Sequence, residues 1–286
     1  MRMRQGALRI LAGLLFCSSA ATAHATIMVA DFNDLTSGAL SGKAGGTGWS
    51  GNWTGSAVAT VSSGDLTSPL YTLTQSGTPQ HDHSTNSTGF RQNFRTSAAS
   101  PTGTIWFSYL ARAEAAGDRA GLSINSPTAT PFNDPGTAYA YLVGDTLNYQ
   151  FGAGTAGTLT GATPVGSNVL IVGKIDLNGG AAGADPISLW VNPDLVANPD
   201  INAYTPTYSN DSVDWLNAIN TIGAVAARVD GGTAGGGDVD NVRFSDGGGN
   251  AAQAYTDVTG AGVPEPTSLA FLALTGAAGL TKRRRR

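Results

Sequence analysis

Charged side chains are scarce in this chain. Asp, Glu, Lys and Arg make up 13% of its 286 residues, about half of the ~25% share that is usual in soluble domains. Half of the 16 Lys and Arg lie at the two ends, as Arg2, Arg4, Arg9 and the run Lys282–Arg286. The residues between Arg9 and Pro264 therefore hold 8 basic side chains against 19 acidic ones, a net charge near −11. Such an acidic body repels phosphate, which argues against nucleic acid as a partner.

Cysteine is almost absent as well. The one cysteine, Cys17, lies in an apolar stretch near the N-terminus. A single thiol excludes an internal disulfide and any metal site built from several cysteines. A domain large enough to bury a core does not need disulfides, so their absence is compatible with an extracellular protein.

The first 25 residues have the three parts of a secretory signal peptide. Basic residues in the first ten positions are followed by the apolar run Ile10–Cys17 and then by Ala23-His24-Ala25. Small residues thus stand at both determining positions of a cleavage site. We expect cleavage after Ala25, with Ala23 as the alternative, and export from the cytoplasm. A buried core helix is the other explanation of the apolar run.

The body of the chain has the pattern of a β-rich domain. Glycine is abundant, at 39 residues, and short apolar runs alternate with clusters of Gly, Ser, Thr, Asn and Asp. Gly and β-branched residues form helices poorly, so this pattern favours strands joined by tight turns. The clearest strand is 104–112, where Ile105, Phe107 and Tyr109 alternate with Trp106, Ser108 and Leu110. The sequence predicts an all-β fold, an antiparallel β-sandwich over residues 26–246. Other strands are expected at 26–32, 58–61, 70–74, 121–125, 138–143, 146–151, 169–177, 187–191, 222–229 and 239–244, and a short helix at 211–219.

The C-terminus carries the most specific pattern. Pro264-Glu265-Pro266 precedes an uncharged, mostly apolar segment at 267–281 and a final basic cluster, Lys282, Arg283, Arg284, Arg285 and Arg286. These three parts in this order resemble the PEP-CTERM family of sorting signals. The resemblance implies recognition by an exosortase-type processing enzyme, removal of the tail, and delivery to the cell surface or extracellular matrix.

The apolar segment is close to the lower limit of the ~17–25 residues that span a bilayer. The basic cluster behind it is expected to stay in the cytoplasm by the positive-inside rule. We therefore expect a C-terminal helix that anchors the chain transiently in the inner membrane, with a permanent single-span anchor as the alternative. Residues 247–262 are rich in Gly and Ala and are expected to link the body to this tail.

Part of the body resembles concanavalin A-like and laminin-G-like jelly rolls. The resemblance is carried by Leu170-Ile-Val-Gly-Lys-Ile-Asp176, by Ile187-Ser-Leu-Trp-Val-Asn-Pro-Asp194 and by the closing segment 238–244. It implies two stacked antiparallel sheets. It transfers no activity, because this fold hosts lectins, glycosidases and adhesion modules.

The body is nearly devoid of Glu, since Glu114 is the only one before the tail. Glycosidases usually work with a pair of carboxylates, and those of the concanavalin-like glucanases are two Glu on one strand. Because this pair is missing, the sequence predicts no catalytic residue and no enzyme, with a pair of Asp as the alternative source of two carboxylates. The main expectation is a non-catalytic surface or matrix module that either binds extracellular polysaccharide or simply assembles in extracellular polymer. The alternative is a secreted polysaccharide hydrolase of concanavalin A-like fold.

Two motifs with possible ligand chemistry are interpreted as loops. His81-Asp82-His83 would present both imidazoles on one face of a strand, but its polar surroundings favour a solvated loop. A zinc site also needs three or four ligands, and no further partner is evident. Gly152–Gly157 matches G-x-G-x-x-G, but no helix can follow it, so we reject a nucleotide site.

Two weaker candidate sites remain. Asp31 and Asp240 meet if the terminal strands pair, and their carboxylates suit a structural calcium ion. Turn capping is the alternative explanation of these residues, and no other cofactor is expected. Trp49 and Trp53 lie in a glycine-rich stretch that we interpret as an exposed loop, where their rings could stack on sugars. Anchoring in the core is the alternative for both tryptophans.

Overall fold

The computed structural model describes residues 25–73, 77–84, 91–99, 101–125, 138–151, 156–161, 163–177, 184–211, 224–230 and 235–261. The expected signal peptide up to His24, the sorting motif and the basic cluster lie outside these ranges, as do residues 152–155 and 212–219. Among the described residues, no helix is long and apolar enough to cross a bilayer.

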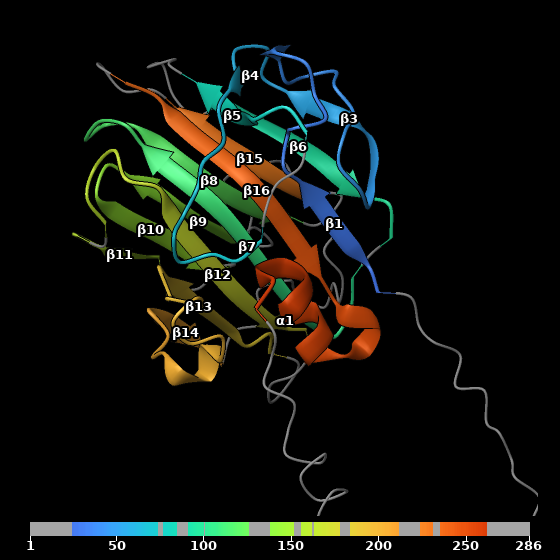
Figure 1. Cartoon of the computed structure of the whole chain (residues 1–286), viewed down its shortest axis with the longest axis vertical. Coiled ribbons are helices and arrows are strands. Elements are labelled where there is room, and N and C mark those ends of the chain that lie inside the picture. Colours follow the sequence, from blue (N-terminus) through green and yellow to red (C-terminus); the bar gives the residue numbers. More distant parts are fainter. Residues whose placement is uncertain are drawn as a thin grey trace, which may run out of the picture.

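The described residues form two antiparallel sheets packed face to face, as expected from the sequence (Figure 1). Sheet A has the strand order β14-β13-β12-β7-β16-β5-β4-β2, with β1 paired to β16 beside this path. Its strands are β1 Ile27–Ala30, β2 Gly38–Ala39, β4 Thr60–Ser63, β5 Gln80–Ser84, β7 Thr104–Ala113, β12 Val169–Asp176, β13 Ile187–Val191, β14 Tyr208–Asn210 and β16 Gly237–Ser245.

Sheet B has the order β11-β10-β9-β8-β15-β6-β3. Its strands are β3 Trp49–Gly55, β6 Arg91–Ser97, β8 Arg119–Asn125, β9 Ala138–Val143, β10 Thr146–Phe151, β11 Gly157–Leu159 and β15 Ala224–Asp230. The terminal strands pair, which is the condition that the calcium hypothesis sets: β1 runs antiparallel to β16 with Met28 opposite Phe244. The expected strand at 70–74 is wrong, since residues 70–73 form irregular chain.

The main core lies between the two sheets, and the alternation of β7 shows how it forms. Ile105, Phe107 and Tyr109 point into this core and are almost fully buried. Trp106 and Leu110, on the opposite face of the same strand, belong to a second apolar cluster. Successive side chains of a strand point to opposite faces, so one strand supplies both cores.

The second core lies under a helix where the sequence predicts a linker. Within residues 247–262, Gly247–Gly249 form a short 3-10 turn, η3, and Ala251–Thr259 form helix α1, which lies across the outer face of sheet A (Figure 1). The Asn250 side chain accepts hydrogen bonds from the first turn, and Gly260 ends the helix with a left-handed φ of 68°. The linker expectation is wrong because α1 buries its apolar face, with Tyr255 only 2% exposed.

The two tryptophans are core residues, not exposed loop residues. Trp49 and Trp53 lie on β3 and are 9% and 1% exposed. The Trp53 ring stacks on Phe32 with centroids 5.8 Å apart, and the Arg95 guanidinium lies 5.7 Å from the Trp53 ring and 5.9 Å from the Trp49 ring. The expectation of sugar stacking at these residues is therefore wrong, since neither ring can reach a ligand. The core-anchor alternative is confirmed.

Candidate functional site

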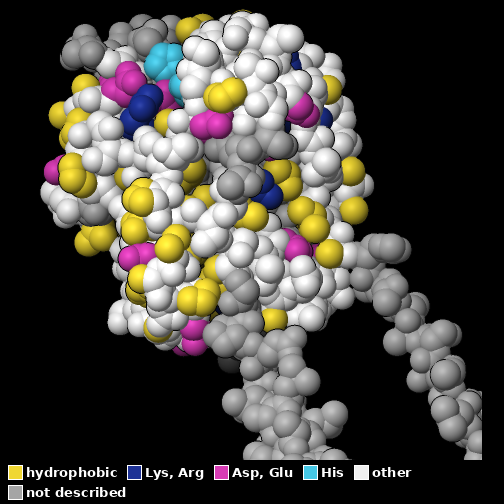
Figure 2. Space-filling model, in the orientation of Figure 1, with side chains coloured by type: hydrophobic (Ala, Val, Ile, Leu, Met, Phe, Trp, Pro, Cys, Tyr) yellow, Lys and Arg dark blue, Asp and Glu magenta, His cyan; other side chains and the backbone are white. Residues whose placement is uncertain are grey.

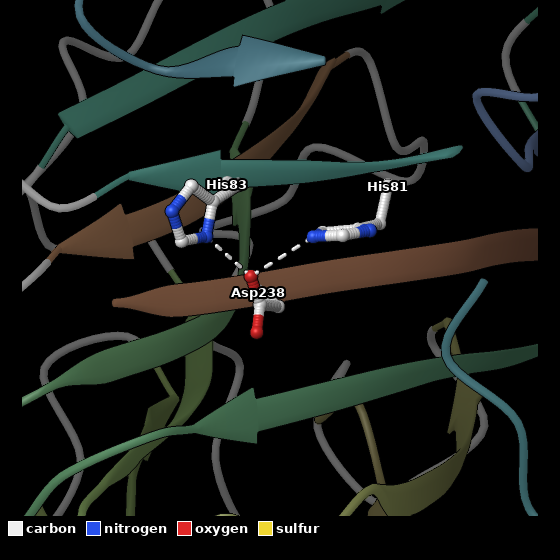
Figure 3. A group of neighbouring side chains, drawn as sticks. All are labelled: His81, His83 and Asp238. Carbon is white, nitrogen blue, oxygen red and sulfur yellow. Dashed lines mark hydrogen bonds and ion pairs between the residues drawn. The ribbon is translucent and has the colours of Figure 1, made fainter. Parts of the chain in front are cut away.

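A cluster of titratable side chains lies on the outer face of sheet A. His81 and His83 come from β5, and Asp238 comes from the neighbouring strand β16, directly opposite His83 in the register. His83 Nδ1 lies 2.5 Å and His81 Nε2 lies 3.1 Å from the same atom, Asp238 Oδ1 (Figure 3). We call His81, His83, Asp238, Arg112 and Glu114 the histidine cluster.

Arg112 and Glu114 complete the histidine cluster at its open side. Arg112 Nε donates to Asp238 Oδ2 over 2.7 Å, and its Nη2 lies 3.1 Å from Glu114 Oε1. The Asp238 carboxylate is fully buried, whereas the side chains of His83 and Arg112 are 21% and 28% exposed. In Figure 2 the histidine side chains reach the surface beside acidic and basic side chains. The cluster is therefore anchored on a buried carboxylate and is open to solvent at one side.

Asp238 and His81 each stabilise the charged form of the other. Burial by itself lowers the pKa of His81, but hydrogen bonds to Asp238 and the Gly64 carbonyl, together with nearby carboxylates, raise it above its ordinary value. Burial favours the neutral form of Asp238, yet its hydrogen bonds to both histidines and the charges of His81 and Arg112 hold its pKa below the usual range. The carboxylate of Asp238 is thus ionised.

The solvated loop expected at His81–His83 is wrong. These residues form a strand whose ladder continues on both sides, to β4 and to β16. The sequence offered no partner for the two imidazoles because Asp238 lies 155 residues from His83 along the chain. The spacing of the two histidines indicated a shared face, and this part of the pattern is confirmed.

Asp82, between the two histidines, points to the opposite side of β5. It is 0% exposed, and neither carboxylate oxygen has a hydrogen-bond partner among the residues that the structure describes. Burial raises the pKa of Asp82 well above its ordinary value; the charge of His81 opposes this shift and that of Asp238 adds to it. The folded protein therefore favours the neutral carboxylic acid at this position.

This acid predicts a pH dependence of stability. The pKa of Asp82 is higher in the folded protein than in the unfolded chain, where it is near 3.8, so the folded state binds the proton more tightly. The contribution of this group to stability is therefore fully present below the unfolded pKa. It is lost as the pH rises through the folded pKa. Asp82→Asn, which cannot ionise, should therefore be more stable than the parent at neutral pH, and this difference should shrink as the pH falls. Urea unfolding from acid to neutral pH measures this, with Asp176→Asn as the control. Equal pH profiles for parent and Asp82→Asn would contradict it.

A second group of functional side chains lies on the outer face of sheet B. In β9, Ala138, Ala140 and Leu142 point into the core, so Tyr139 and Tyr141 point outward. The same alternation turns Asn148 and Gln150 of β10 and Arg119 of β8 to the outer face, where all five side chains are half-buried. We call these the tyrosine face, made of Arg119, Tyr139, Tyr141, Asn148 and Gln150.

The side chains of the tyrosine face are held in fixed positions. The Tyr139 hydroxyl donates to Gln150 Oε1 over 2.7 Å, from the residue directly opposite it in the register. The rings of Tyr139 and Tyr141 lie with centroids 5.2 Å apart. Gly121 lies opposite Tyr141 on β8, and a Cβ there would come within 2.6 Å of the Tyr141 Cβ and still closer to backbone atoms of Ala140 and Tyr141, so glycine permits the close approach of β8 and β9 here. The sequence analysis missed this face. The alternation of Ala and Leu with Tyr along 138–143 was the signal that could have revealed it.

The two carboxylates expected to hold calcium have separate environments. Asp31 lines a shallow cavity of about 190 Å³ together with Asp34 and the backbone near Gly46. Asp240 uses both oxygens for backbone groups, accepting from Leu66 N over 2.9 Å and from Asn241 N over 2.6 Å. In the described part of the chain, only His81, His83 and Asp238 form a group of three or more potential ligands. Calcium at Asp31 and Asp240 stays a prediction.

Comparison with known proteins gives similarity of fold at low identity. No family model and no curated protein matches the chain. Among solved structures, alginate lyase Aly36B is 14% identical over 77% of this chain and 96% of its own, with a TM-score of 0.42. The endo-β-1,4-glucuronan lyase of the fungus Trichoderma reesei is 13% identical over 79% of this chain and 98% of its own, with a TM-score of 0.41. The SPRY domain of human HERC1 is 15% identical over 52% of this chain and 81% of its own, with a TM-score of 0.33.

The expectation of a non-catalytic body is corrected by the names of these similar structures, several of which are polysaccharide lyases. At these TM-scores the likeness assigns no activity to this chain. The missing pair of Glu excludes one hydrolytic mechanism and not catalysis in general. At these identities the likeness concerns the fold, so the case for an activity depends on the chain's own residues.

Proposed function

We propose that this protein is an enzyme that cleaves polysaccharide chains on the tyrosine face of sheet B. The observation that carries the proposal is the Tyr139 hydroxyl, held 2.7 Å from Gln150 on a sheet face that also presents Tyr141, Asn148 and Arg119. The proposal agrees in substrate class with the alternative drawn from the sequence and replaces its carboxylate mechanism.

The chemistry of the tyrosine face suits a carbohydrate polymer. Tyrosine combines an apolar ring with a polar tip, and the amides of Asn148 and Gln150 both donate and accept hydrogen bonds. Sugars present apolar C–H faces between hydroxyl groups, so these side chains match both kinds of surface. Arg119 adds a guanidinium that can bind a carboxylate of an acidic sugar in two parallel hydrogen bonds.

Tyr139 is the proton-transferring residue in this proposal. Breaking the bond between a sugar carbon and the bridging oxygen leaves both bonding electrons on the oxygen, which takes a proton. The electron-poor carbon is satisfied either by water, which adds and loses a proton in hydrolysis, or by loss of a proton from the adjacent carbon, which forms a double bond in elimination. Tyrosine is among the side chains that perform general acid catalysis, because its phenol O–H can donate a proton. The outward-facing positions of β8, β9 and β10 in the described chain carry no Asp or Glu, so a pair of carboxylates is not what this face offers.

Incubation of the purified full-length chain with neutral and uronate-containing polysaccharides tests the proposal. New reducing ends report cleavage, and ultraviolet absorbance of an unsaturated product separates elimination from hydrolysis. We expect reducing ends from at least one polymer. Absence of cleavage across both classes, with the fold intact by circular dichroism, contradicts the proposal.

We also propose that the protein is exported, on the basis of the N-terminal pattern and the PEP-CTERM-like tail. In the native host, the parent chain should be found outside the inner membrane in a form shorter than its full length. Changing Pro264, Glu265 and Pro266 to Ala should leave export intact and cause a longer, membrane-retained form to accumulate. Fractionation and immunoblotting measure this. If the triple variant is processed like the parent, the motif is only a linker.

A further inference from the structure

We propose that His81, His83 and Asp238 bind a divalent transition-metal ion. The two imidazoles and the carboxylate each offer one ligand atom, and these atoms all lie within 4.8 Å of one another. Both nitrogens belong to β5 and lie within 3.1 Å of a single carboxylate oxygen of Asp238, on the adjacent strand β16 (Figure 3). This site is on sheet A and does not depend on the activity proposed for sheet B.

The hydrogen bond between His81 and the Gly64 carbonyl implies a proton or a metal ion between His81 and Asp238. His81 Nδ1 lies 2.6 Å from the Gly64 carbonyl oxygen, which can only accept, so this nitrogen carries a proton. In the neutral imidazole, Nε2 then presents a lone pair to Asp238 Oδ1 at 3.1 Å, and two lone pairs face each other. Either a second proton or a metal ion must lie between them. A metal ion satisfies Nε2, Oδ1 and the nearby His83 Nδ1 together, whereas without a metal ion His81 must hold a second proton and His83 must hold its proton on Nδ1.

The surroundings of the three residues are those of a metal centre. Metal-binding histidines commonly donate their second N–H to a backbone carbonyl, which fixes the ring orientation, as the Gly64 carbonyl does for His81. Arg112 Nε donates a hydrogen bond to Asp238 Oδ2 over 2.7 Å, so that the other oxygen, Oδ1, faces the histidines. The charge of Arg112 is balanced in turn by Glu114 at 3.1 Å. A Cβ at Gly236 would come within 2.3 Å of the His83 ring, so glycine leaves the space for this imidazole.

The ligand types select the class of metal. Two imidazoles and one carboxylate suit zinc and its first-row neighbours, whereas calcium takes six to eight oxygen ligands. Ligand atoms on one tetrahedral zinc lie ~3.3 Å apart, given bonds of ~2.0 Å. The separations of 2.5 and 3.1 Å from Asp238 Oδ1 need only a small opening to reach this value. Three protein ligands leave a fourth position, and the partial exposure of His83 places it toward solvent.

Titration of the chelator-treated full-length chain with Zn²⁺ by calorimetry tests the site. We expect one ion per chain, no comparable binding of Ca²⁺ or Mg²⁺, and affinity at least about 100-fold weaker in His83→Ala, because loss of a ligand exceeds the 10–100-fold effect of outer-shell changes. Asp176→Asn on the same sheet is the matched control and should bind like the parent.

Two further measurements keep the test decisive. Cobalt substitution should give the visible absorption of a tetrahedral site in the parent chain and not in Asp238→Asn, with circular dichroism showing that each variant is folded. Undetectable Zn²⁺ binding in the parent, or unchanged binding in folded His83→Ala and Asp238→Asn, overturns the proposal. Neither readout involves polysaccharide cleavage, so its outcome is separate from that of the tyrosine face.

Discussion

Replacing Tyr139 by Phe should lower the rate of polysaccharide cleavage by about 100- to 10,000-fold, the usual contribution of a positioned general acid. The substitution keeps the aromatic ring and removes only the hydroxyl that donates to Gln150. A departing sugar oxygen then has no proton donor at this position. The loss should appear in the turnover number rather than in the affinity for polymer, because Tyr141, Asn148 and Arg119 still form the binding surface.

The control for Tyr139→Phe is the same chemical change far from the tyrosine face. The Tyr204 hydroxyl donates to backbone oxygens of Asp194 and Asn198, in the segment that follows β13. Tyr204→Phe should therefore keep parental activity. Reducing-end assays with both variants at matched thermal stability measure the difference. If Tyr139→Phe cleaves polymer at the parental rate, Tyr139 is not the proton donor and the chemistry lies elsewhere.

The parts of the fold that the sequence predicts correctly are those where one strand carries an apolar face. β7, β9 and β12 alternate or run through apolar residues, and their positions agree with the expectation to within one or two residues. β5 and β6 were missed because Gln80–Ser84 and Arg91–Ser97 contain almost no apolar side chain. These strands are held by ladder hydrogen bonds with neighbours on both sides, and such long-range pairing leaves no local pattern.

The same reasoning explains the errors at helix α1 and β3. Residues 247–262 are rich in Gly and Ala on average, yet Ala254, Tyr255 and Val258 form a buried stripe at helical spacing. The average composition of the segment does not reveal that these three residues share one face of a helix. The glycines around Trp49 and Trp53 suggest a loop. The two large aromatic rings are nevertheless buried in the core, and their packing holds this segment as a strand.

The candidate sites were only partly accessible from the sequence for a related reason. The spacing of His81 and His83 indicated one shared face, which the strand confirms. Their common partner Asp238 belongs to the far end of the chain and becomes a neighbour only when β16 inserts between β5 and β7. Pairing of distant strands depends on the whole core, so a constellation of this kind cannot be deduced from spacing alone.

Asp238→Ala should be the most destabilising single substitution in the histidine cluster. It removes a fully buried carboxylate and leaves His81, His83 and Arg112 without the anion to which all three are bound. Breaking one side of a buried ionic arrangement costs about 3–5 kcal/mol, since the remaining charges stay desolvated. The partial exposure of His83 and Arg112 lets water relieve some of this loss, so we expect a value near 3 kcal/mol, toward the lower end of that range.

The matched control lies on the same sheet and is a partly exposed carboxylate with a single ion-pair partner among the described residues. Asp176 pairs with Lys174 at 2.7 Å, but both side chains are about one-quarter to one-third exposed. Asp176→Ala should therefore cost no more than about 1 kcal/mol, as is usual for pairs in contact with water. Urea unfolding of both variants in chelator, so that bound metal does not contribute, measures the difference in unfolding free energy. Because the two changes remove the same side chain, equal losses would mean that burial of the Asp238 carboxylate is not what makes the histidine cluster important for stability.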